Sequence, residues 1–252
     1  MTRESFHREL QDIQTEMLKM GSLVEKQIHE AVHFLSTQDL AGAQAVLDKD
    51  DIVDQMQIDI EEDCMRLIAL QQPLASDLRT VVAIFKITTD VERIGDHACN
   101  IAELTLRIGE EPLIKPLIDI PIMADKTKAM VRDSLTCFVE RDLELAEAVR
   151  QADEPVDELY SQLFDELIGI VLEGENGRRS SQAINLLFVA RYLERIADHA
   201  TNIAERVMYM VTGHRVDHMS TGPDGPQGVD VEEMFGQASV ATESINNANS
   251  DS

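Results

Sequence analysis

The sequence predicts an all-α protein built as a tandem repeat of two antiparallel three-helix bundles. Apolar residues make up 44% of the 252 residues, aromatic residues only 4%, and Trp is absent. Gly and Pro are scarce, at 12 and 7 residues. This composition favours long helices over sheets. The number of bundles follows from an internal repeat, because residues 92–103 return almost unchanged at residues 194–205.

The repeated motif reads Glu-Arg-Ile-x-Asp-His-Ala-x-Asn-Ile-Ala-Glu, and only two of its twelve positions differ between the copies. An earlier stretch, residues 39–54, also returns at residues 142–157 with Asp39, Asp50 and Asp54 matched by aspartates. Two related stretches that recur in the same order indicate two copies of one structural unit. We therefore expect a first repeat at residues 1–110 and a second at residues 121–214.

The helices of the first repeat follow from apolar spacing and from Pro73. A first helix is expected from about residue 5 to 35, and Ser36 and Thr37 are candidate caps for a second. That second helix should continue to about residue 70, because the residue before a proline avoids the helical conformation. A third should run from Pro73 to about residue 107. The apolar positions that predict the first helix are Leu10, Ile13, Met17, Met20, Val24, Ile28 and Val32.

The second repeat should follow the same plan after a linker that begins at Gly109 and contains Pro112. Its helices are expected at about residues 122–139, 142–173 and 180–212, with a break at 174–177. Beyond it, residues 215–252 form an acidic tail that is poor in apolar residues, which predicts disorder. A short helix around residues 231–239 that docks on a partner is the alternative for part of this tail.

The charge balance narrows the classes of function. A formal net charge of −25 disfavours nucleic-acid binding and suits a protein that binds cations or basic surfaces, although solvation alone would also explain it. The N-terminus carries no apolar signal segment, and no apolar run reaches the roughly 18–20 residues of a membrane span. The three cysteines form no metal-binding or disulfide pattern. We therefore expect a cytoplasmic protein with reduced thiols that meets a membrane only through partners.

The repeated motif places oxygen-bearing side chains on one helix face. At about 100° per residue, Glu92, Asp96 and Asn100 lie within a narrow arc. The second copy does the same with Glu194, Asp198 and Asn202. Each helix preceding a motif also carries two aspartates one turn apart, Asp50 with Asp54 and Asp153 with Asp157.

In an antiparallel hairpin that turns near Pro73, Asp54 and Glu92 should lie at the same level, because they are equally far from the turn along the chain. The same holds for Asp157 and Glu194 in the second repeat. Four carboxylates at one level need a counter-ion. Sites made only of oxygen ligands suit hard cations such as Mg²⁺, Mn²⁺, Ca²⁺ or oxidised iron. The sequence thus predicts a metal site in each repeat.

A second interpretation is that arginines neutralise these stripes. Arg93 and Arg195 could form surface ion pairs with them, which would contribute little energy. His97 and His199 point to the side of the stripe, so a role outside direct ligation is favoured for them. The adjacent Arg178 and Arg179 at the start of a helix are a weaker candidate for anion binding.

These features resemble the PhoU family of bacterial phosphate-uptake regulators. The resemblance covers residues 3–212 and rests on repeat length, motif order and motif duplication. It implies a cytoplasmic, non-enzymatic regulator that restrains the ABC phosphate transporter through its ATPase and restrains a sensor histidine kinase. It also implies a homodimer and carboxylate sites for iron, manganese, magnesium or zinc. By matching positions, the metal ligands would be Asp50, Asp54, Glu92, Asp96, Asn100, Asp153, Asp157, Glu194, Asp198 and Asn202.

Two other functions are compatible with the residues. A metal-dependent phosphohydrolase would use the same carboxylates with an open coordination position and an activated water. A plain helical scaffold would use the stripes only as ion pairs. The sequence carries no Gly-rich phosphate loop and no nucleophile elbow, which favours a regulator over an enzyme.

Overall fold

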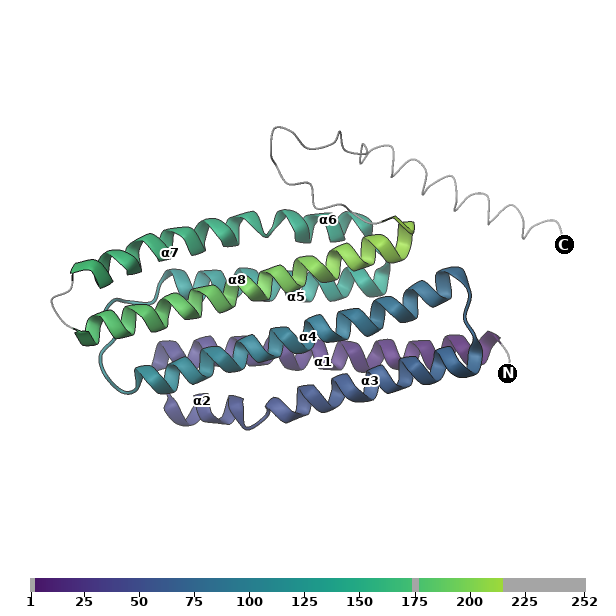
Figure 1. Ribbon diagram of the computed structural model, residues 1–252, viewed down its shortest axis with the longest axis horizontal. Helices are drawn as coiled ribbons and strands as arrows, with labels where there is room; N and C mark the ends of the chain where they lie inside the picture. The colour runs from purple at the N-terminus through teal and green to yellow at the C-terminus, as the bar shows by residue number, and fades with distance from the viewer. Residues whose placement is uncertain (1–2, 174–176, 215–252) are drawn as a thin grey trace, which may run out of the picture.

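A computed structural model describes residues 3–173 and 177–214, and within them it contains eight α-helices and no β-strand (Figure 1). The all-α prediction is confirmed, whereas the predictions for the tail at 215–252 lie outside the described residues. The first repeat consists of α1 (Arg3–Thr37), α2 (Leu40–Leu47), α3 (Asp50–Gln71) and α4 (Ala75–Ile108). The second consists of α5 (Asp119–Glu140), α6 (Leu143–Gln151), α7 (Glu154–Glu173) and α8 (Gly177–Thr212).

The middle helix of each repeat is divided in two, which corrects the prediction of one continuous helix. In the first repeat, Lys49 leaves the helical conformation, with φ −107° and ψ 0°, between α2 and α3. In the second, Pro155 lies in the first turn of α7. Proline has no amide proton to bond the carbonyl four residues earlier, so α6 ends before it. Each repeat is therefore a three-helix bundle whose middle helix is broken.

The predicted caps of that middle helix are also wrong. Ser36 and Thr37 lie in the last turn of α1, where their hydroxyls donate hydrogen bonds of 2.9 Å to carbonyls one turn earlier. The actual N-cap of α2 is Asp39, whose carboxylate accepts a hydrogen bond from the amide of Gly42. In the second repeat, Asp142 does the same for α6. A short carboxylate satisfies the free amides at a helix start better than a hydroxyl already bonded within the previous helix.

The turn between α3 and α4 lies at Pro73, as predicted from the sequence. Helix α3 ends at Gln71, and Gln72 adopts the left-handed conformation with φ 49° just before Pro73. Leu74 is extended, and α4 begins at Ala75. The apolar positions predicted for the first helix are all buried in α1, so its core-facing side is confirmed.

Helices α4 and α8 lie side by side and join the two repeats (Figure 1). On their outer flanks, α3 packs against α4 and α7 against α8, so four long helices form one layer. Helices α1 and α5 lie behind this layer and pack against each other. In residues 3–173 and 177–214, no helix is both long and apolar enough to cross a membrane.

The contact between α1 and α5 depends on Gly21. A Cβ atom at this position would lie 2.1 Å from Cδ1 of the buried Leu135. We therefore expect Gly21→Ala to lower the free energy of unfolding by about 1–3 kcal/mol, as overpacked cores do. Gly169 in α7 is the matched control, because a Cβ there meets no atom within 4 Å. Chemical denaturation should show Gly169→Ala to be more stable than the parent by about 0.5–1 kcal/mol, since alanine favours the helix.

A double variant checks the cause of the Gly21→Ala effect. Adding Leu135→Ala makes room for the new methyl group, so the two substitutions together should cost less than the sum of their separate effects. Additive effects would contradict the steric explanation.

Candidate metal centres

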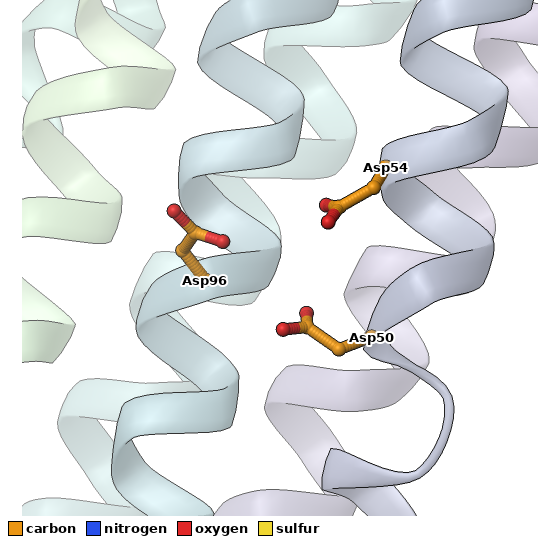
Figure 2. A group of neighbouring side chains, drawn as sticks. All are labelled: Asp50, Asp54 and Asp96. Atoms are coloured by element: carbon orange, nitrogen blue, oxygen red, sulfur yellow. The ribbon is translucent and has the colours of Figure 1, made fainter.

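Three aspartates of the first repeat converge between α3 and α4. One carboxylate oxygen from each of Asp50, Asp54 and Asp96 lies within 4.8 Å of the other two. Figure 2 shows Asp50 and Asp54 reaching from α3 toward Asp96 on α4. Hard cations bind oxygen ligands at about 2.0–2.6 Å, so oxygens on opposite sides of one ion are about 4–5 Å apart. The group is thus close to the size that one cation would need, and we call it site one.

Local structure explains why these aspartates meet. The break at Lys49 makes Asp50 the first residue of α3, and Asp54 follows one turn later. Side chains on a helix lean toward its N-terminus, so those of α3 lean away from the hairpin turn and those of α4 lean toward it. Asp54 therefore meets Asp96, one turn farther from the turn than its predicted partner Glu92. The half-buried Asn100 lies one turn beyond Asp96 on α4.

Burial and mutual repulsion both act on the carboxylates of site one. Burial is the larger cause that raises the pKa of Asp54, Glu92 and Asp96, and neighbouring aspartates raise these pKa values further. Arg93 opposes the shift of each, and its guanidinium lies 3.1 Å from Asp96 Oδ2 and 3.4 Å from Glu92 Oε2. The ion pair that the sequence suggested is therefore present. One arginine nevertheless faces four carboxylates, Asp50 included, so the site retains a negative charge that attracts a cation.

Cys99 is a member of site one that sequence reasoning missed. Its thiol donates a hydrogen bond of 3.2 Å to Asp50 Oδ1. Burial raises the pKa of this thiol, and the hydrogen bond to Asp50 raises it further. The thiol therefore stays protonated and acts as a donor to the carboxylate. The matching residue of the second repeat is Thr201, whose hydroxyl can also donate a hydrogen bond, and this match was the signal available in the sequence.

In the second repeat, the matching residues border a pocket. Asp153, Asp198 and Asn202 line a pocket of about 480 Å³ together with Glu205. Burial, followed by repulsion from Asp157 and Asp198, raises the pKa of Asp153 to about 6. We call this group, with Asp157 and Glu194, site two.

Glu194 is the most buried carboxylate of site two, at 9% exposure. Burial is the largest cause that raises its pKa to about 7, and Asp198 and Asp157 add to the shift. Burial also raises the pKa of Asp157. One oxygen of Glu194 bonds to Arg191, whereas the other, Oε2, is buried without a hydrogen-bond partner among the described residues. An unsatisfied buried carboxylate oxygen is costly and would be satisfied by a cation or a proton.

The two sites differ in the number of arginine side chains near their carboxylates. Site two contains Arg150, which lies 2.7 Å from Glu147 and 3.6 Å from Glu205, and Arg195, which lies 3.3 Å from Asp198. The position that matches Arg150 in the first repeat is Leu47. The carboxylates of site one therefore have fewer cationic side chains to balance them than those of site two.

The two motif histidines meet at the boundary between the repeats. The rings of His97 and His199 are 5.6 Å apart between centroids, and His97 stacks on Tyr192. His199 Nδ1 lies 3.0 Å from Asp90 Oδ1, and Arg206 Nε donates to Asp90 Oδ2 over 2.7 Å. His97 and His199 are therefore not among the side chains whose oxygens converge in site one. Together with Asp90 and Arg206, they connect α4 to α8.

Asp90 and Arg206 are residues that sequence reasoning missed. Their matching positions in the other repeat are Tyr192 and Leu104. A comparison of the repeats for positions where a charge replaces an apolar or aromatic residue would have found both. Such a difference between the repeats is expected for a contact that joins one repeat to the other, because that contact is not duplicated.

The pKa shifts of site two predict how stability depends on pH when metal is removed. The pKa of Glu194 is raised from 4.5 to about 7 in the folded chain. The folded state therefore binds more protons than the unfolded state between these values, and stability falls as pH rises through them. We expect the Tm of the chain in chelator to be higher at about pH 5.5 than at about pH 7.5.

The variant Glu194→Gln isolates this contribution from general charge repulsion. It should reduce the change in Tm between the two pH values, whereas Glu158→Gln, an exposed position on α7, should not. Equal pH dependence in the parent and in Glu194→Gln would contradict the burial of this carboxylate.

The fold and these sites define a class of protein: a duplicated helical bundle with two carboxylate centres on its long helices. The family model described as the PhoU domain matches the chain twice, at residues 17–105 and 120–207. The phosphate-specific transport system accessory protein PhoU homolog of Clostridium acetobutylicum is 43% identical over 218 residues, which cover 86% of this chain and 99% of that protein. The homolog from Pseudomonas aeruginosa is 39% identical over 219 residues, or 86% and 89% of the two chains. This chain belongs to the PhoU family.

Two solved structures extend the similarity to three dimensions. The crystal structure of PhoU from Pseudomonas aeruginosa has a TM-score of 0.79 and 38% identity, and covers 83% of this chain and all of that one. That of the phosphate transport system regulatory protein PhoU from Streptococcus pneumoniae has a TM-score of 0.77 and 34% identity, covering 84% and 99%. The duplicated bundle is therefore shared with experimentally determined members of the family.

Proposed function

We propose that this chain regulates phosphate uptake by contact with partner proteins and performs no catalysis. Family membership across both repeats is the observation that carries this proposal. Its relatives are named as accessory proteins of the phosphate-specific transport system, and the protein from Streptococcus pneumoniae as a regulatory protein of phosphate transport. In site one, burial and the hydrogen bond to Asp50 keep the Cys99 thiol protonated, so this thiol is not an activated nucleophile.

The partners we propose are the ATPase of an ABC phosphate transporter and a sensor histidine kinase, both met in the cytoplasm. Binding to the first would restrain uptake when phosphate is plentiful, and binding to the second would restrain the starvation response. We also propose that the chain acts as a homodimer. The association of the relatives with the phosphate transport system supports the first of these partners most directly.

We further propose that site one and site two bind a divalent or trivalent metal ion. Supporting this, the aspartate oxygens of site one are close enough to share one ion, and a buried oxygen of Glu194 lacks a partner among the described residues. All the candidate ligands are oxygen atoms, which suits magnesium, manganese or iron in preference to softer ions. A bound ion would hold α3 against α4 and α7 against α8, and so fix the surface that a partner meets.

Gene deletion in the source bacterium tests the regulatory function. We expect phosphate uptake and the starvation response to stay active at high phosphate, and the intact gene to restore control. Purified chain should also retain the cognate transporter ATPase and sensor kinase in pull-down experiments. Unchanged uptake and signalling, with no partner retained, would contradict the proposal. Metal-dependent hydrolysis of a phosphate ester that is lost in Asp96→Ala would instead favour a phosphohydrolase.

A further inference from the structure

An exposed apolar stripe runs along the start of α4. Leu74 is the extended residue just before α4, and Leu78 and Val82, four residues apart, lie on one face of the helix. They are 80%, 38% and 40% exposed. Lys86, also exposed, follows one turn beyond Val82. We call the three apolar residues the α4 stripe.

The second repeat matches the α4 stripe only in part. The positions that match Leu78 and Val82 in the second repeat are Ser180 and Ile184. Ser180 is polar, whereas Ile184 is 41% exposed and Phe188, one turn beyond it, is 50% exposed. The start of α4 is therefore more apolar than the start of α8, where the exposed apolar pair begins one turn later. Exposed apolar surface of this kind indicates a contact that the described residues do not provide.

The described part of the chain ends beside this stripe. Arg79 Nε, next to Leu78, donates a hydrogen bond of 3.3 Å to the carbonyl of Met210 near the end of α8. A Cβ atom placed on Gly213 would lie 3.8 Å from the guanidinium carbon of Arg79. The chain therefore leaves α8 within about two helical turns of the whole stripe.

The sequence beyond this point contains one apolar cluster with helical spacing. Val231, Met234, Phe235 and Ala238 follow the i, i+3, i+4, i+7 pattern of an amphipathic helix. Asp230 precedes them as an N-cap residue, and Glu232 and Glu233 would occupy the first turn, where acidic side chains are favoured.

Val229 and Met234 complete the start signal. They occupy the positions before the N-cap and in the second turn that pack together in a hydrophobic staple. Both family matches end at or before residue 207, so this segment lies outside them. The residues 229–238 are called the tail segment below.

We propose that the tail segment docks as a short helix on the α4 stripe of the same chain. Its apolar face would cover Leu74, Leu78 and Val82, and its acidic first turn suits the neighbouring Lys86 and Arg79. For a flexible chain as long as residues 215–228, the root-mean-square length would be about 20 Å, which is enough to reach the stripe. A tether of this length gives the segment an effective concentration of about a millimolar, so weak docking suffices.

Docking in this position would let the tail compete with other proteins for the first repeat. The face of α4 that bears Leu78 and Val82 continues toward its C-terminus into Glu92 and Asp96 of site one. A partner that approaches site one along α3 and α4 would therefore have to displace the tail segment. The tail acts as an internal competitor whose strength sets how readily the first repeat is bound.

Hydrogen exchange on the full-length chain tests this proposal. Amides of the tail segment should exchange at least about tenfold more slowly than those of residues 242–250, because docking protects a helix. The variant Leu78→Glu with Val82→Glu should remove this protection. Ile184→Glu is the matched control in the second repeat and should leave it unchanged. Protection should also be independent of protein concentration, as expected for docking within one chain.

A second variant guards against misfolding of the stripe variant. Met234→Glu with Phe235→Glu alters only the tail and should raise hydroxyl-radical labelling of Leu78, while Val240→Glu should not. Three results would overturn the proposal: an unprotected tail segment, protection that survives the stripe variant, or protection that rises with protein concentration. The last would show docking on a second copy of the chain.

Discussion

Replacing Asp90 by alanine is expected to lower the free energy of unfolding by about 1.5–3 kcal/mol, because it removes a buried carboxylate that accepts hydrogen bonds from charged or polar side chains. Asp90 is 5% exposed and accepts hydrogen bonds from Arg206 and His199 on the opposite repeat. The network holds α4 against α8, so its loss should weaken the contact that joins the two repeats. Denaturant unfolding measures the effect directly.

Two further variants separate the causes of this loss. Asp90→Leu combined with Arg206→Leu removes both charges and should recover much of the stability, because an apolar pair can replace a buried ion pair. Asp125→Ala is the control for an exposed aspartate, whose ion pair with Lys128 should contribute about 0–1 kcal/mol. A similarly small cost for Asp90→Ala would show that the network does not hold the repeats together.

The combined variant Asp50→Asn, Asp54→Asn and Asp96→Asn is expected to be more stable than the parent without metal and less stable than the parent with metal. In chelator it should have the higher Tm, because it removes carboxylates whose burial and mutual repulsion destabilise the folded chain. With Mn²⁺ at about a hundredfold its Kd, the parent should gain roughly 2.7 kcal/mol per occupied site. The variant should forgo the gain at site one.

Thermal unfolding with and without Mn²⁺ checks this reversal. The control is Asp59→Asn with Glu62→Gln, two exposed acidic positions on α3 outside the site. It should respond to Mn²⁺ as the parent does. Equal responses of the parent and the site-one variant would indicate that the aspartates of site one serve only in ion pairs.

Local patterns in the sequence were sufficient for most of the fold. The apolar spacing of α1 and the stop before Pro73 depend on neighbouring residues, and both are confirmed. The break between α2 and α3 was missed because the apolar pattern continues through it, from Val46 to Val53 and Ile60. In the second repeat, Pro155 would have revealed the corresponding break.

The candidate sites were predictable as faces of helices but not as contacts. Helical spacing placed Asp96 on one face, yet its partner on α3 depends on how side chains lean in an antiparallel hairpin. The hydrogen bond from Cys99 to Asp50 depends on the same register. The contact of Asp90 with Arg206 joins two repeats, and no pattern within either repeat encodes how the two are placed together.

Metal content is the most direct test of the proposed sites. Elemental analysis by inductively coupled plasma mass spectrometry should find stoichiometric metal in the purified chain. The variant with Glu92, Asp96, Glu194 and Asp198 changed to alanine should have lost it. Absence of metal from both proteins, even after incubation with Mn²⁺, Fe²⁺ and Mg²⁺, would contradict the metal sites and leave ion pairs as the role of the stripes.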